Sequence, residues 1–151
     1  MKRMIAFLFG LTILFSISFF KTDNFSIVND FEKLVVVSKE PLLYQNYQIS
    51  GNQYYYTLSN IEGKKFLEDK NDHDIEGYIF YFNNSFDFDN FSKNVEFLIE
   101  KNTQITNYDI YYGYYSKFDD YRYVNNKKIN FQLVHNDEKW ILGFPIILTG
   151  F

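Results

Sequence analysis

The sequence predicts an α+β domain in which a curved antiparallel sheet packs against one main helix, behind an N-terminal signal or anchor helix. Short runs rich in tyrosine, phenylalanine and β-branched residues recur through most of the chain, and short polar turns separate them. One stretch, residues 85–102, instead carries apolar residues at helical spacing. A chain of 151 residues is expected to form one domain. We assign that domain to residues 25–151 and treat residues 1–24 as a signal peptide or an uncleaved membrane anchor.

The N-terminal segment, MKRMIAFLFGLTILFSISFF, places an apolar run from Met4 to Phe20 behind the cations Lys2 and Arg3. This pattern is typical of a secretory signal. The run also approaches the shortest membrane span of about 17 residues, and no Ala-x-Ala site follows it, although cleavage after Ser18 stays open. In both cases the basic end stays in the cytoplasm. We therefore expect an exported protein, either membrane-anchored and facing outward or released to the periplasm or the extracellular space.

The composition restricts the partners. The chain has 19 acidic against 15 basic residues and a net charge of -4, and such a chain repels nucleic acid and anionic lipid headgroups. We expect no nucleic-acid partner, and membrane contact only through the N-terminal segment. The absence of cysteine excludes disulfides, thiol catalysis, thiolate metal sites and a lipoprotein anchor. Aromatic residues make up 22% of the chain, which fits either a sugar-binding surface or the codon bias of an AT-rich genome.

The first part of the domain is predicted to contain one mixed element and a hairpin. FSIVNDFEKLVVVSKE starts at Phe25 with helical spacing and contains LVVV at residues 34–37, in which the three valines are β-branched, so we expect a helix that finishes extended. LLYQNYQIS and NQYYYTLSN predict two strands around the turn Ser50-Gly51-Asn52. Residues 64–70 predict a short helical piece or loop.

The central strand and the main helix are predicted next. GYIFYFNN, which starts at Gly77, is apolar and aromatic almost throughout, so we expect a central strand there. The helix is predicted over Ser85–Asn102, with Ser85 as N-cap and with Asp87 and Asp89 near the positive end of the helix dipole. Its stripe at helical spacing consists of Phe88, Phe91, Val95, Leu98 and Asn102.

Four further strands are predicted after this helix. NYDIYYGYYSK holds Gly113, where we expect a bulge, and DDYRYVNN leads into a turn at Asn125-Asn126. KKINFQLVHN and KWILGFPIILTGF follow, and residues 139–149 should pair antiparallel with residues 128–136. Pro145 has no N–H to donate, so it should lie at an edge or a bulge. Short connections of this kind predict an antiparallel sheet.

The chain ends on INFQLVHNDEKWILGFPIILTGF, and this ending resembles that of the YwmB-like family, exported bacterial proteins with a fold like that of the TATA-box-binding protein. That family closes on a hairpin with a Gly-x-Pro-Ile core, a threonine and an aromatic terminus, which here are Gly143, Pro145, Ile146, Thr149 and Phe151. The resemblance implies a β-α-β4 unit from Gly77 onward and a reduced first unit over residues 25–75. It also implies a role in the cell envelope without catalysis.

Few residues indicate a chemical site. Asp72-His73-Asp74 could hold a divalent cation but is more typical of a solvated loop, and Asp119-Asp120 fits a hairpin turn, with a cation site as the alternative. His135 is expected as a core or rim residue on an apolar strand face. The sequence has no nucleophile elbow and no glycine-rich phosphate loop, so we expect no enzyme, no cofactor and no metal site.

The sequence therefore predicts a non-enzymatic, exported cell-envelope protein that acts as a binding or accessory domain for an envelope protein or a cell-wall component. The alternative is a module that binds a polysaccharide or a lipid on exposed tyrosine faces. The candidate ligand residues for that alternative are Tyr112, Tyr114, Tyr121 and Tyr123. A third class, an envelope hydrolase, has no catalytic set that the sequence identifies.

Overall fold

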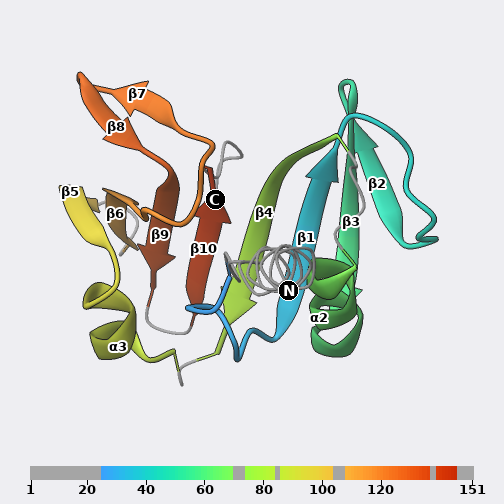
Figure 1. The fold of residues 1–151 in the computed structure, drawn as a ribbon, viewed down its shortest axis with the longest axis horizontal. Helices are drawn as coiled ribbons and strands as arrows, with labels where there is room; N and C mark the ends of the chain where they lie inside the picture. The colour runs from blue at the N-terminus through green and yellow to red at the C-terminus, as the bar shows by residue number, and fades with distance from the viewer. Residues whose placement is uncertain (1–24, 70–73, 84–85, 104–107, 137–138, 146–151) are drawn as a thin grey trace, which may run out of the picture.

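The structure is a computed structural model that describes residues 25–69, 74–83, 86–103, 108–136 and 139–145. These residues form an eight-stranded antiparallel sheet, a separate two-stranded ribbon and two short helices (Figure 1). In chain order the elements are β1 (Lys33–Ser38), β2 (Tyr47–Ser50), β3 (Gln53–Ser59), α2 (Asn60–Glu68), β4 (Ile75–Phe82), α3 (Phe88–Ser92), β5 (Glu96–Thr103), β6 (Tyr108–Tyr114), β7 (Arg122–Val124), β8 (Lys127–Ile129), β9 (Phe131–His135) and β10 (Trp140–Phe144).

The strand order in the large sheet is β2-β3-β1-β4-β10-β9-β6-β5. β4 lies in the middle, paired with β1 on one side and β10 on the other, so the predicted central strand is confirmed. β10 pairs antiparallel with β9, from Trp140 opposite His135 to Gly143 opposite Gln132. This pairing confirms the prediction for the last strand over residues 140–144, whereas residues 146–151 lie outside the described residues.

Two tight turns set the hairpins. Ser50 pairs directly with Gln53, so Gly51-Asn52 forms a two-residue turn, and Gly51 has a φ of 61°. Asn125 and Asn126, with φ of 51° and 60°, connect β7 to β8 in a turn of the same length. Glycine and asparagine adopt this left-handed region at low cost, and such turns match the right-handed twist of the paired strands. Both turn predictions are confirmed.

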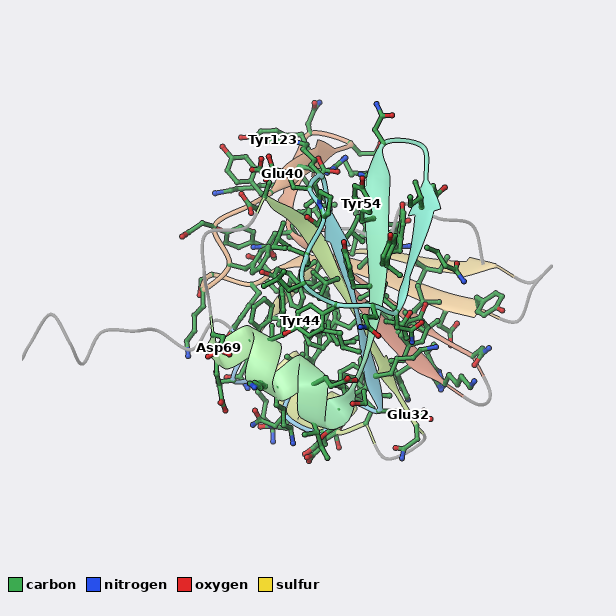
Figure 2. All side chains as sticks on the ribbon, turned by 90° about the vertical axis from the view of Figure 1, so that its right-hand side faces the viewer. Glu32, Glu40, Tyr44, Tyr54, Asp69 and Tyr123 are labelled. Atoms are coloured by element: carbon green, nitrogen blue, oxygen red, sulfur yellow. The ribbon has the colours of Figure 1, made fainter. Side chains whose placement is uncertain are left out.

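The main core lies on one face of the sheet. The fully buried side chains that the sheet contributes to it include Leu34, Tyr56, Phe80, Phe131, Leu133 and Leu142. The segment before β1 covers them, with the ring centroids of Phe25 and Phe31 at 5.5 and 5.3 Å from that of Phe80. α3 covers the other half, where the Phe91 ring lies 5.4 Å from that of Phe131. Figure 2 shows α2 lying along this side of the sheet.

α2 is the longest helix among the described residues. A capping box starts it: the Ser59 side chain accepts the Glu62 N–H, and the Glu62 carboxylate accepts the Ser59 N–H at 2.9 Å. Gly63 lets the helix approach the core closely, because a Cβ there would lie 2.8 Å from the Phe31 ring. The helical piece predicted over residues 64–70 is therefore present, but it begins earlier, at Asn60.

The prediction of a main helix over Ser85–Asn102 is wrong. The described chain forms the short helix α3, in which the Asp87 carboxylate accepts the Asn90 N–H at 2.9 Å, and then continues as the edge strand β5. β5 pairs with β6 along its length, so its backbone groups find partners in another strand rather than within a helix. The hydrophobic periodicity of one segment cannot predict this pairing, because the partner strand lies elsewhere in the sequence. The described chain is consequently mostly β, without a main helix.

Three smaller differences concern single elements. Residues 25–31 form turns instead of a helix, and the chain becomes extended at β1. The bulge expected at Gly113 lies in the neighbouring strand, where the register shifts between Phe97 and Ile99. Gly113 itself permits a close approach, since a Cβ there would overlap the Phe131 ring. Pro145 follows the last residue of β10 through a cis peptide bond, so it does not interrupt the described ladder.

The N-terminal segment, residues 1–24, lies outside the described residues. Among the helices that are described, none has the length and apolarity to cross a membrane. The expectation of a signal or anchor helix therefore remains a prediction.

Phe91 and Leu98, which the sequence placed on one helix, are expected to differ in energetic weight. Phe91 is 1% exposed in the core, whereas Leu98 is half-buried at the irregular part of an edge strand. We expect Phe91→Ala to lower the free energy of unfolding by about 3–5 kcal/mol and Leu98→Ala by about 1 kcal/mol or less. Urea denaturation of both variants measures this difference. Equal losses would contradict the position of Leu98 in β5.

Candidate functional site: a tyrosine surface around Lys128

The second face of the large sheet has no helix packed on it among the described residues. Val37, Ile79 and Val134 form a buried cluster there, and every side chain packed around this cluster comes from the sheet itself. Those side chains are Val35, Tyr55, Tyr81, Tyr108, Ile110 and Ile141. The face therefore consists of aromatic and aliphatic side chains that no other described element covers.

β6 extends this face with two of the predicted ligand residues. Tyr112 stands opposite Gln132 of β9, and Gln132 Nε2 donates a hydrogen bond to the Tyr112 hydroxyl at 3.4 Å. Tyr114 lies two residues further along β6 and points to the same side. Both tyrosines are half-buried. Gln132 is 4% exposed, and its Oε1 has no hydrogen-bond partner among the described residues.

The β7–β8 hairpin brings the other two predicted tyrosines to Tyr114. Lys128 of β8 stands opposite Tyr123, and its Nζ lies 4.0 Å from the ring centroid of Tyr121 and 4.8 Å from that of Tyr114. The Lys128 ammonium also donates to the Tyr114 hydroxyl at 3.2 Å. The rings of Tyr121 and Tyr123 meet edge to face, with centroids 5.6 Å apart and an interplanar angle of 89°. We call Tyr112, Tyr114, Tyr121, Tyr123 and Lys128 the tyrosine surface.

Exposure separates the members of this surface. Tyr121 is 46% and Tyr123 69% exposed, whereas most aromatic rings of the described chain pack into the core. Burial of ring area is what makes aromatic residues stabilise a fold. Two neighbouring exposed tyrosines on a hairpin therefore contribute little to stability.

A buried asparagine fixes the orientation of the hairpin. Asn130, fully buried between β8 and β9, accepts the Tyr115 N–H at 2.7 Å through Oδ1. Its Nδ2 donates to the carbonyl oxygens of Tyr115 and Phe118, both at 2.7 Å. Its own N–H donates to the Gly113 carbonyl at 2.9 Å. These bonds hold the turn from which the chain enters β7, and thereby the position of Tyr121 and Tyr123.

The charge of Lys128 is favoured by its surroundings. The hydrogen bond to the Tyr114 hydroxyl is the largest cause that raises the pKa of the Lys128 ammonium above its usual value. The ring faces of Tyr114 and Tyr121 attract a cation electrostatically. No carboxylate in the described part of the chain forms an ion pair with Lys128. The ammonium is thus held by aromatic rings instead of by an acidic partner.

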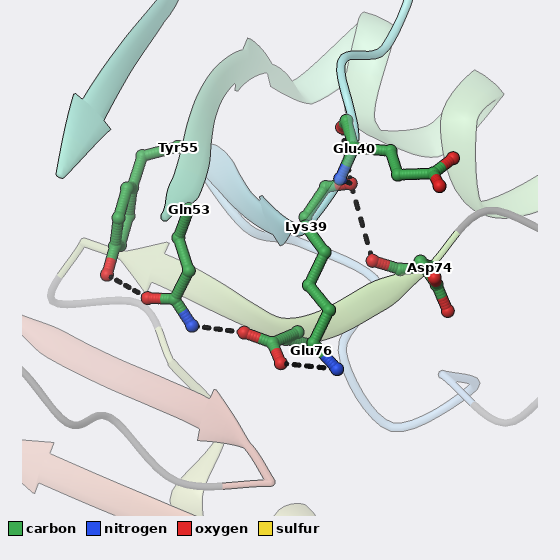
Figure 3. A network of polar contacts seen from close by, with 7 residues as sticks. Lys39, Glu40, Gln53, Tyr55, Asp74 and Glu76 are labelled. Atoms are coloured by element: carbon green, nitrogen blue, oxygen red, sulfur yellow. Dashed lines mark hydrogen bonds and ion pairs between the residues drawn. The ribbon is translucent and has the colours of Figure 1, made fainter. Parts of the chain in front are cut away.

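A polar network lies at the rim of the sheet (Figure 3). The Tyr55 hydroxyl donates to Gln53 Oε1 at 2.9 Å, the Gln53 amide donates to Glu76, and Lys39 Nζ lies 3.0 Å from the Glu76 carboxylate. The Gln53 hydrogen bond, followed by that of Lys39, lowers the pKa of Glu76. These side chains satisfy one another across β3, β4 and the end of β1, so we interpret the network as structural.

The other candidate residues stay apart from the tyrosine surface. His135 stacks on Trp140 with ring centroids 3.9 Å apart, and its Nδ1 lies 4.0 Å from the Asp109 carboxylate, which confirms a rim residue. Asp119-Asp120 does not form the predicted hairpin turn but leads into β7. Of the Asp72-His73-Asp74 stretch only Asp74 lies among the described residues. Within the described residues, no group of three potential ligands could hold a metal ion.

Lys128 is the residue that sequence reasoning missed. Its position opposite Tyr123 could have been predicted, since a two-residue turn at Asn125-Asn126 pairs residue 123 with residue 128. The contact between this hairpin and Tyr114 could not be predicted from the sequence, because it depends on the packing of the buried Asn130. Of the four predicted tyrosines, Tyr114 and Tyr121 contact Lys128, Tyr123 contacts Tyr121, and Tyr112 contacts Gln132 instead; their role as ligand residues stays a prediction.

Comparison with known proteins identifies no relative. The chain matches no protein-family model, no curated protein and no solved structure. Function must therefore be argued from the site itself.

Asn130→Ala tests the role of the buried amide. The substitution removes the partner of the Tyr115 N–H and of the Phe118 carbonyl oxygen, whereas the Tyr115 carbonyl keeps the Phe118 N–H as a donor. Each unsatisfied buried group costs about 1–3 kcal/mol. We expect a loss of at least about 2 kcal/mol in the free energy of unfolding, measured in urea. Asn46→Ala, at an exposed site whose side chain has no comparable role, serves as the control. Similar stability of the two variants would contradict the stabilising role of the Asn130 side chain.

Proposed function

We propose that the protein is a non-enzymatic binding module whose ligand lies on the tyrosine surface. The observation that carries this proposal is the convergence of residues from two separate parts of the chain on one cation. Tyr114 comes from β6, whereas Tyr121 and Tyr123 come from the hairpin. The rings of Tyr114 and Tyr121 contact the Lys128 ammonium, and the Tyr123 ring contacts that of Tyr121. Tyrosine offers a rigid apolar ring with a polar hydroxyl, which suits a surface that meets ligands in water.

The energetics also favour binding over a structural role. The rings of Tyr121 and Tyr123 are largely outside the core, and Lys128 has no described carboxylate partner. A structural lysine on a protein surface usually lies in water or beside an acid. Here the ammonium and the exposed rings together present hydrogen-bond donors, a charge and apolar area at one place.

We place this module in the cell envelope, where its partner would be an envelope protein or a cell-wall component. Export is supported by the apolar segment behind Lys2 and Arg3. The excess of acidic residues argues against a nucleic-acid partner.

We also retain, as a proposal, the relation to the YwmB-like family and its TATA-box-binding-protein-like fold. The chain order from β4 onward, in which a strand is followed by the helix α3 and then by further antiparallel strands, supports it. β2, β3 and β1 with α2 would be the reduced first unit, and β4 with α3 and the later strands would be the second.

A binding assay with envelope material tests the proposed function. Immobilised full-length protein is incubated with the solubilised envelope fraction of the cells that produce it, and bound material is quantified. We expect the double variant Tyr121→Ala, Tyr123→Ala to lose most of the bound material. Tyr47→Ala removes a ring of similar exposure, 47%, from the edge strand β2 and should bind like the wild type. Undiminished binding by the double variant would refute the tyrosine surface as the site.

A further inference from the structure

The tyrosine surface is a corner and not a flat platform. The Tyr121 and Tyr123 rings are perpendicular, at 89°, and Tyr123 is the more exposed of the two at 69%. Directly opposite Tyr123 on the neighbouring strand stands Lys128, and opposite residues in an antiparallel pair have Cβ atoms about 4.5–5.5 Å apart. The Lys128 ammonium lies 4.0 Å from the centroid of the Tyr121 ring, and that centroid is 5.6 Å from the centroid of Tyr123. A ring stacked on Tyr123 would therefore have the ammonium within reach of a group at its edge.

Lys128 retains hydrogen-bonding capacity for such a group. An ammonium has three donors, and one of them is used by the Tyr114 hydroxyl at 3.2 Å. Lys128 is half-buried, with the rings of Tyr114 and Tyr121 against it. Aromatic rings attract the cation but leave it with its full charge.

This arrangement favours a ligand that carries its own negative charge. A neutral ligand stacked on Tyr123 would remove water from the ammonium without neutralising it, and an unpaired charge taken out of water is costly. A carboxylate would instead form a charge-assisted hydrogen bond, which is about twice as strong as a neutral one. One small unit of the ligand must therefore carry both the apolar ring face that stacks on Tyr123 and the single negative charge that pairs with Lys128.

We propose that the tyrosine surface binds an acidic saccharide, with a pyranose ring stacked on Tyr123 and its carboxylate paired with Lys128. This inference rests on the proposed function and names the ligand class of the same site. A carbohydrate ring supplies the flat C–H face that a tyrosine ring accepts, and a sugar acid supplies one carboxylate at the ring edge.

An anionic membrane fits the site less well. Membrane attraction comes from clusters of several cations, each contributing about 1 kcal/mol, together with inserted apolar side chains. The tyrosine surface has one cation, and the chain as a whole has a net charge of -4. A single sugar carboxylate needs only the one ammonium that the site provides.

Titration calorimetry with matched sugars tests the ligand class. Full-length protein in a neutral detergent is titrated with oligogalacturonate and hyaluronan tetrasaccharides, and with the carboxyl-reduced form of each. We expect at least one acidic form to bind about tenfold or more tightly than its reduced form, which corresponds to 1.4 kcal/mol. Lys128→Met should remove this preference, and Lys128→Arg should keep part of it. Lys127→Met, which removes the same charge one residue earlier, should leave the preference unchanged. Circular dichroism of each variant verifies folding.

The remaining outcomes separate this inference from the proposed function. Equal binding of acidic and reduced forms would overturn the role of the charge while leaving the tyrosine surface as a glycan site. If no sugar binds but phosphatidylglycerol vesicles bind in a manner that requires Tyr121 and Tyr123, the ligand is a lipid and the saccharide is wrong. The saccharide is also wrong if only the envelope fraction binds through these tyrosines. If neither sugars, vesicles nor envelope material bind through these tyrosines, both proposals fail.

Discussion

The buried side chain of Asn130 is the interaction on which the arrangement of the C-terminal half depends. Its amide closes hydrogen bonds at 2.7 Å with Tyr115 and Phe118, and both of those side chains enter the core. Because the amide is shielded from water, its hydrogen bonds meet little competition, and a missing partner would be costly. The bonds direct the chain away from the large sheet into the β7–β8 ribbon. The same residue thus links the stability of the core to the position of the hairpin tyrosines.

The aromatic richness of the chain is explained mainly by a one-sided core. Phe144, at the end of the last described strand, has ring contacts with Phe80, Phe118 and Phe131 at centroid distances of 6.3, 5.0 and 6.2 Å. Large rings fill the space between a single sheet and the short segments that cover it, and ring pairs add about 0.5–1.5 kcal/mol each to their burial. Most of the phenylalanine content therefore needs no ligand to explain it. Core packing does not explain the exposed rings, such as those of the β7–β8 hairpin.

The local part of the fold was predictable. The turns at Gly51 and Asn125-Asn126, the central strand from Gly77 and the pairing of the last two strands follow from neighbouring residues. Each element depends on a turn conformation or a run of apolar side chains within a few positions. The segment after Asp87 was not predictable in this way, because its apolar residues fit both a helix and an alternating strand. Pairing with β6 makes residues 96–103 of this segment a strand.

By itself the sequence determined the charge, the absence of cysteine and the strand-rich pattern. Tertiary structure decided which face of the sheet is covered, that residues 96–103 form an edge strand, and that Lys128 lies among Tyr114 and Tyr121. The physical reason is the range of the interactions. Turn geometry and hydrophobic alternation act over a few residues, whereas strand partners and the contacts of a buried amide join positions that only packing brings together.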